Sequence, residues 1–151
     1  MTPSRRAFLI GLAATPAALA ALPAVAAEPP VFQSNGVAIN GYDPVAYFTE
    51  SRPVEGSADH TSMHDGATFQ FASAANKAMF DADPAAFAPQ YGGYCAFAVS
   101  KGYTAKTDPD AWTVHNGKLY LNFNRLIRAR WAVSKDSFIA DADANWPAVL
   151  G

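Results

Sequence analysis

Two turn dipeptides in the chain limit the ways in which its strands can pair. Asn116-Gly117, a pair typical of two-residue hairpin turns, stands between Trp112-Thr113-Val114 and Leu119-Tyr120-Leu121, which are rich in β-forming residues. Asp65-Gly66 is a second turn signal, inside a predicted hairpin over residues 58–72. Because a two-residue turn makes the strands on either side antiparallel neighbours, the sequence predicts small antiparallel sheets.

Short helices are predicted between and after these hairpins. Asp43-Pro44, Ser73 and Asp83-Pro84 are typical helix starts, and apolar residues recur every four residues near the C-terminus. The predicted helices cover residues 45–49, 73–81, a short turn from 84, and a C-terminal region in which Phe123, Ile127 and Trp131 form one stripe and Ser134 caps a further helix. The fold class is therefore α+β: small antiparallel β-hairpins packed with short helices, and a helical C-terminus. Four aromatic residues are predicted to lie in the core: Phe71, Trp112, Tyr120 and Trp131.

The first 27 residues resemble an export signal. Ser4-Arg5-Arg6-Ala7-Phe8-Leu9 is similar to the twin-arginine motif, an apolar stretch follows, and Ala24-Val25-Ala26-Ala27 is typical of a cleavage site. An uncleaved membrane anchor is the alternative, but the stretch is mostly alanine and contains Pro16 and Pro23. We therefore expect a twin-arginine signal peptide over 1–27, cleaved near Ala26 or Ala27. One domain over 28–151, beginning with a tether over 28–34, would be delivered to the periplasm by the twin-arginine export machinery.

The export prediction depends on the arginine pair. Replacing both Arg5 and Arg6 by lysine is expected to leave the precursor in the cytoplasm, because that pathway recognises the paired guanidinium groups. Fractionation followed by mass measurement of the periplasmic product tests this. Mature protein reaching the periplasm from the double-lysine variant would contradict the assignment.

Charge and cysteine content limit the classes of function. Outside the leader, nine basic residues face thirteen acidic ones, so this part has a formal charge of −4. An acidic domain argues against nucleic-acid binding, which depends on neutralising phosphates. Cys95 is the only cysteine, so no intrachain disulfide can form, and an unpaired thiol is unusual in an oxidising compartment.

Cys95 is the first candidate site residue. It follows Gly92-Gly93-Tyr94, where two glycines would let backbone amides approach a bound group closely. Amides facing the sulfur would lower its pKa, and a thiolate is both a nucleophile and a ligand for soft metals. The alternative is a small buried apolar residue, which the following Phe97-Ala98-Val99 run favours.

His60 and His64 are the second candidate. Their spacing places both side chains on one face of either a helix or a strand, and Met63 between them would add a thioether. The alternative is two solvated histidines beside a turn.

The remaining polar residues predict no site. His115 borders a turn, and the arginines near the C-terminus read as the solvated side of a helix. The paired carboxylates bracket prolines or turns and read as helix caps rather than a general acid and base. These residues are Arg125, Arg128 and Arg130, and the pairs Asp81/Asp83 and Asp108/Asp110.

Four segments together resemble the YHS domain family, and in particular its exported bacterial stand-alone branch. They are Asn40-Gly41-Tyr42-Asp43-Pro44-Val45-Ala46-Tyr47-Phe48, residues 66–80 from Gly66 to Phe80, Tyr91-Gly92-Gly93-Tyr94-Cys95-Ala96, and residues 112–122 ending in Gly117-Lys118-Leu119-Tyr120-Leu121-Asn122. The resemblance covers nearly the whole chain after the leader. It implies a metal-linked domain, because cysteines at three positions of the family's motif are taken to bind metal. Here the matching positions are Ala46, Ala72 and Asn76, none of which ligates a soft metal well.

Three functions from different classes follow. The first is a periplasmic binding module, rather than an enzyme, for copper or another soft metal ion, with Cys95, His60 and His64 as ligands. The second is a single-cysteine thiol redox protein acting through Cys95, and the third is a non-catalytic domain that binds a protein partner. A metal site requires Cys95 to lie within about 5 Å of the histidines, given metal–ligand bonds of about 2.0–2.3 Å.

Overall fold

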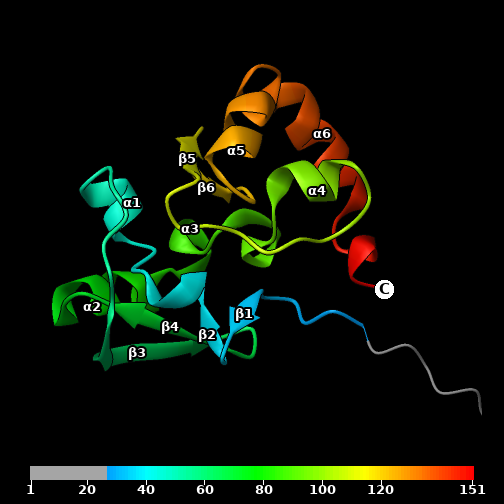
Figure 1. Cartoon of the computed structure of the whole chain (residues 1–151). Helices are drawn as coiled ribbons and strands as arrows, with labels where there is room; N and C mark the ends of the chain where they lie inside the picture. Colours follow the sequence, from blue (N-terminus) through cyan, green and yellow to red (C-terminus); the bar gives the residue numbers. More distant parts are fainter. Residues whose placement is uncertain (1–26) are drawn as a thin grey trace, which may run out of the picture.

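The computed structural model describes residues 27–151, and the predicted leader with Arg5 and Arg6 lies outside them, apart from Ala27. Within this range the chain is α+β, as the sequence predicts (Figure 1). In Figure 1 the four-stranded sheet and α2 occupy the lower part, and the second hairpin with α4, α5 and α6 the upper part. The strands are β1 (Gln33–Ser34), β2 (Val37–Ala38), β3 (Ser57–His64), β4 (Ala67–Phe71), β5 (Trp112–His115) and β6 (Lys118–Leu121). The α-helices are α1 (Ala46–Thr49), α2 (Ala74–Ala82), α3 (Pro84–Phe87), α4 (Ala96–Ser100), α5 (Arg125–Ala132) and α6 (Lys135–Asn145).

Both predicted hairpins are present with the predicted turns. β3 and β4 pair antiparallel across Asp65-Gly66, and β5 and β6 pair antiparallel across Asn116-Gly117. All four turn residues have positive φ, at 49° and 80° in the first turn and 52° and 73° in the second. Asn, Asp and Gly tolerate this left-handed region, which explains their presence in the turns.

The N-terminal tether predicted over 28–34 is instead part of the fold. Gln33–Ser34 forms β1 and pairs with β2 across Asn35-Gly36, and β2 joins β4 in parallel at Val37 and Thr68. The sheet order is therefore β1-β2-β4-β3, with one parallel neighbour that turn chemistry does not predict. The backbone N–H of Glu28 donates to the Leu150 carbonyl, which holds the start of this segment against the C-terminus.

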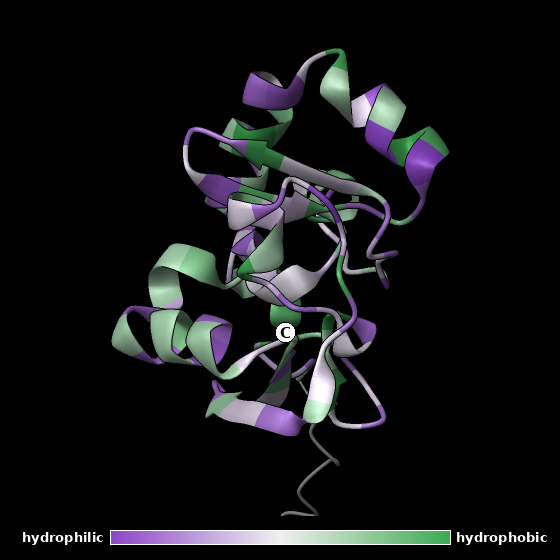
Figure 2. Cartoon of the chain, turned by 90° about the vertical axis from the view of Figure 1, so that its left-hand side faces the viewer, coloured by the Kyte–Doolittle hydropathy of each residue, from purple (hydrophilic) through white to green (hydrophobic). Residues whose placement is uncertain are grey.

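The helix starts follow the predicted caps in part. The Ser73 hydroxyl accepts the N–H of Asn76 at 3.1 Å, as an N-cap should. Asp83 and Ser134 occupy the N-cap positions of α3 and α6, as predicted, but neither side chain makes a capping hydrogen bond. The cap of α5 is Asn124, whose Oδ1 accepts the Ile127 N–H at 2.8 Å. The C-terminal helices carry hydrophilic and hydrophobic residues along their length (Figure 2).

Two apolar clusters form the core, and β6 lies between them. Leu119 and Leu121 belong to the cluster around the four-stranded sheet, whereas Tyr120 belongs to the cluster that contains Trp131. Successive side chains of a strand point to opposite faces, so one strand serves both clusters and joins them into one core. Phe71, Tyr120 and Trp131 are buried as predicted, but Trp112 is only partly buried, with its ring 5.5 Å from that of Tyr47.

Over residues 27–151, no helix has the length and apolar character needed to cross a membrane.

Candidate functional site

The glycine pair before Cys95 sets the path of the backbone. Tyr91, Gly92 and Gly93 have φ of 57°, 61° and 83°, so the backbone reverses direction through three left-handed residues. A Cβ at Gly92 would overlap the Pro30 carbonyl, and the Gly92 carbonyl accepts the Phe32 N–H at 2.9 Å. The Gly-Gly sequence therefore lets the N-terminal segment pack closely against this turn.

Cys95 lies immediately before α4, with its sulfur among polar backbone and amide groups. The residue is 1% exposed. Its thiol donates a weak hydrogen bond to Asn122 Oδ1, 3.6 Å from Sγ, and the same oxygen accepts the Phe97 N–H at 3.0 Å. Backbone N–H groups of Ala98, Phe123 and Phe97 also face the sulfur. The thiol is thus buried, but it is not in a purely apolar environment.

Burial decides the acidity of this thiol. Loss of hydration raises the pKa of Cys95 above its ordinary value, and this effect outweighs the three N–H groups, which act in the opposite direction. The lowered pKa that the sequence analysis ties to amides facing the sulfur is therefore not found, and the burial expected in the alternative interpretation is. The thiolate is therefore the minor form at neutral pH, although N–H donors are already in place to stabilise it.

A small apolar cavity of about 230 Å³ lies beside Cys95. Phe123 is 40% exposed and Tyr103 52% exposed, so these aromatic side chains stand between the cavity and solvent. The lining residues come from α4, the loop after it and the start of α5: Cys95, Phe97, Ala98, Tyr103, Ala105, Phe123 and Ile127. This arrangement places a single thiol in the wall of an apolar pocket that opens to solvent.

Asn122 is the partner of Cys95 that sequence reasoning missed. It follows the apolar strand β6 directly and is fully buried, while its Nδ2 has no hydrogen-bond partner among residues 27–151. The only feature of the sequence that could have identified Asn122 is its position as a polar residue at the end of an apolar strand. The amide is held by its oxygen, which serves both the thiol and the Phe97 N–H.

The two predicted histidine ligands lie on the other hairpin, in different surroundings. His64 packs edge-on against the rings of Phe69 and Phe80, and its Nε2 lies 3.4 Å from Asp65 Oδ2. His60 lies in the irregular stretch of β3 between Ser57 and Thr61. His64 lines a separate cavity of about 330 Å³, of which Cys95 is not part.

Met63 does not join the histidines. It is 69% exposed, and its sulfur accepts a hydrogen bond from Thr68 Oγ1 at 3.1 Å, on the opposite face of β3 from its neighbour His64.

The positions at which the YHS resemblance places metal-binding cysteines surround a carboxylate here. Asp43 is fully buried, and its Oδ2 accepts the Ala72 N–H at 2.8 Å and the Asn76 Nδ2–H at 2.7 Å. Its Oδ1 accepts the Val45 N–H at 2.8 Å. These bonds use both carboxylate oxygens to join α1, β4 and α2 in one structural hydrogen-bond cluster.

The residues present do not fit a metal centre of several ligands. Among residues 27–151, no group of three or more His, Cys, Asp or Glu side chains is placed to hold an ion. Cys95 and His64 line different cavities, and Ala46, Ala72 and Asn76 offer no soft ligand.

The other polar candidates have structural partners. Asp81 accepts hydrogen bonds from Lys77 and Ser62, and the pKa of Asp81 is lowered, chiefly by the Lys77 bond. His115 Nε2 lies 2.8 Å from Asp136 Oδ1 and links the second hairpin to α6.

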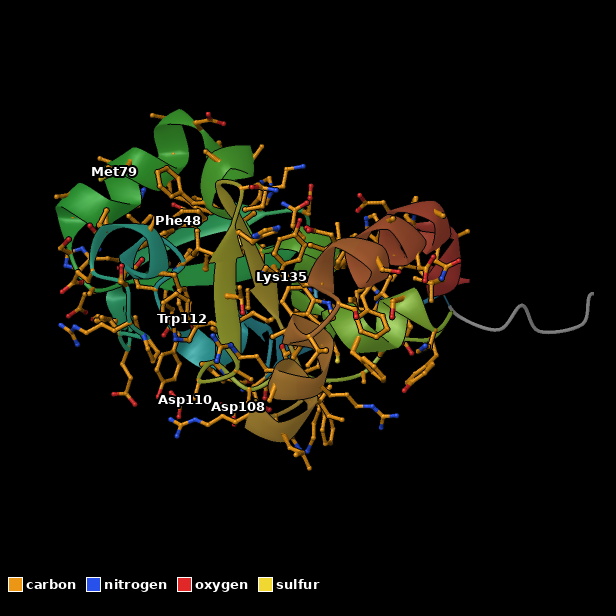
Figure 3. The ribbon with its side chains drawn as sticks, turned by 90° about the horizontal axis from the view of Figure 1, so that it is seen from above. Phe48, Met79, Asp108, Asp110, Trp112 and Lys135 are labelled. Atoms are coloured by element: carbon orange, nitrogen blue, oxygen red, sulfur yellow. The ribbon has the colours of Figure 1, made fainter. Side chains whose placement is uncertain are left out.

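Asp108 and Asp110 lie at the same outer edge of the molecule, where Asp108 Oδ1 accepts the Asp110 N–H and Asp110 Oδ2 lies 3.7 Å from Arg125 (Figure 3).

Comparison of the sequence with protein-family models, with curated proteins and with solved structures found no match.

Proposed function

We propose that this chain is an exported, YHS-like single-thiol domain that exchanges disulfides with small molecules through Cys95. The observation that carries the proposal is the position of the thiol. Cys95 is in the wall of a 230 Å³ apolar pocket, with three backbone N–H groups facing its sulfur. The twin-arginine-like leader and the resemblance to the exported branch of the family support delivery to the periplasm, where disulfides persist.

The chemistry requires only a disulfide and a thiol. Cys95 loses its proton to solvent, and the thiolate attacks one sulfur of a disulfide RSSR, so that a Cys95–S–SR bond forms and RS⁻ leaves and takes up a proton. The N–H groups of Phe97, Ala98 and Phe123 stabilise the attacking thiolate. Because no second cysteine is present, an external thiol R′SH must release the mixed disulfide as RSSR′ and restore the Cys95 thiol.

The test uses 4,4′-dithiodipyridine, an uncharged aromatic disulfide that releases a coloured thione. The native protein is expected to react in proportion to reagent concentration and to gain one pyridylthio group by mass. Since burial raises the pKa of Cys95, the rate is expected to be slow near neutrality and to rise about tenfold per pH unit from about pH 7 to about pH 9, without levelling off. The rate for 2-mercaptoethanol is compared over the same range.

Two variants serve as controls. Cys95→Ser is expected to abolish the reaction, and Ala105→Leu, which fills the pocket, is expected to slow it while leaving its pH profile unchanged. A rate that does not depend on reagent concentration and equals the rate of global unfolding would make Cys95 a packed core residue. That result would overturn the proposal and favour a non-catalytic binding domain.

A further inference from the structure

We infer that the Cys95 pocket selects anionic small disulfides and thiols, a substrate class set by three cations beside its aromatic walls. This inference rests on the proposed function, because it names the substrates of the same thiol. It depends on residues that take no part in the exchange step itself. These residues are Lys101, Lys106 and Arg130, referred to below as the cation group.

Each member of the cation group lies against an aromatic ring that lines the pocket. Lys101 Nζ is 5.5 Å from the ring centroid of Phe97 and 5.1 Å from that of Phe138, which does not line the pocket. Arg130 Cζ is 5.6 Å from the Phe97 ring centroid. Lys106 Nζ is 5.7 Å from the ring centroid of Phe123. Cation–π contacts hold the charged ends over the rings while leaving them in solvent. Each of the three positive charges thereby lies no more than 5.7 Å from the centroid of a ring that lines the pocket, while none of the three residues is itself part of the lining.

The charges of the cation group are not neutralised by ion pairs within residues 27–151. The ion pairs of the described chain involve other cations, such as Arg52 with Glu50 and Arg125 with Asp110. One acidic residue lies near the group, because Asp108 lines a neighbouring cavity together with Lys106 and Phe123. The group therefore makes a positive patch on a domain whose formal charge is −4, and Lys106 is expected to contribute least to it.

The size and polarity of the pocket define the rest of the ligand. A volume of about 230 Å³ is below that of a typical pocket for a drug-sized ligand, so it accommodates one ring or a short chain rather than a whole large molecule. Its lining is apolar apart from the thiol and the Tyr103 hydroxyl. The matching ligand is an amphipathic anion, with an apolar body bearing the sulfur and a carboxylate that reaches the cation group.

The experiment compares an anionic with an uncharged aromatic disulfide. 5,5′-Dithiobis(2-nitrobenzoate) carries a carboxylate on each ring, whereas 4,4′-dithiodipyridine is uncharged at about pH 8. For each reagent the rate with native protein is divided by the rate with 2-mercaptoethanol, which removes intrinsic reactivity. This normalised rate is expected to be at least about tenfold higher for the anionic reagent at low salt, and the preference is expected to disappear near 1 M salt.

Variants that remove positive charges show which cations cause the preference for the anionic reagent. Lys101→Gln and Arg130→Gln are each expected to slow the anionic reagent about threefold, and the triple variant with Lys106→Gln about tenfold or more. The uncharged reagent is expected to change less than about twofold with all of them. Arg52→Gln, a matched charge removal outside the pocket, should leave both rates unchanged.

The outcomes separate the two proposals. If both reagents react with the native protein but show equal normalised rates, unchanged in the triple variant, the inference is wrong and the proposed function stands. If neither reagent reacts before the protein unfolds, the proposed function itself is wrong. A preference that Arg52→Gln reduces as much as Lys101→Gln would also overturn the inference, because the selectivity would then come from overall charge.

Discussion

Replacing Trp131 by alanine is expected to lower the free energy of unfolding by about 3–5 kcal/mol. Trp131 is fully buried in α5, and its ring centroid lies 5.5 Å from that of Tyr120 on β6. It shares the second apolar cluster with Val99 of α4 and Ala142 of α6. Truncation would open a cavity where three helices and the central strand meet, and the small residues around it cannot fill that space.

Chemical denaturation of the two proteins, followed by circular dichroism, measures this difference. Trp131→Phe is the matched variant, since it keeps an aromatic ring and removes the indole N–H, which has no hydrogen-bond partner among the described residues. We expect the phenylalanine variant to lose no more than about 1.5 kcal/mol, because the volume change is small and a buried unpaired donor is removed. A loss under about 1 kcal/mol for Trp131→Ala would show that the surrounding helices close over the gap.

The parts of the fold that could be predicted are those that neighbouring residues determine. Both two-residue turns, the α2 cap at Ser73 and the burial of Trp131 follow from local chemistry or from periodicity. The parallel pairing of β2 with β4 could not be predicted, since it joins residues about 30 positions apart through only one register pair, Val37 with Thr68. Asn35-Gly36 does carry a turn signal, but its strands are two residues long and too short to show alternation.

In the candidate site, too, some features follow from the local sequence and others depend on tertiary packing. The single cysteine marked Cys95 as a candidate, but its acidity depends on how deeply the fold buries it, and that is a property of tertiary packing. The spacing of His60 and His64 suggested a shared face, yet nothing in the spacing relates that hairpin to α4. Asn122 and the cations over Phe97 become visible only when β6, α4 and α5 are brought together.

Removal of the buried carboxylate at Asp43 is expected to be as damaging as the loss of Trp131. Asp43→Ala would leave the N–H groups of Val45 and Ala72 and the Asn76 amide without their acceptor. Each unsatisfied buried donor costs about 1–3 kcal/mol, although water entering the gap would recover part of this. We therefore expect the free energy of unfolding to fall by about 3–5 kcal/mol, because α1, β4 and α2 lose their common hydrogen-bonding partner.

Equilibrium denaturation of Asp43→Ala beside two control variants tests this. Asn76→Ala removes one donor and leaves Asp43 bonded to two backbone N–H groups, so its cost is expected to be about 1 kcal/mol. Asp59→Ala makes the same substitution at an exposed site on β3, where the expected change is within about 0.5 kcal/mol. If Asp43→Ala were no more destabilising than Asp59→Ala, the Asp43 cluster would not support the fold.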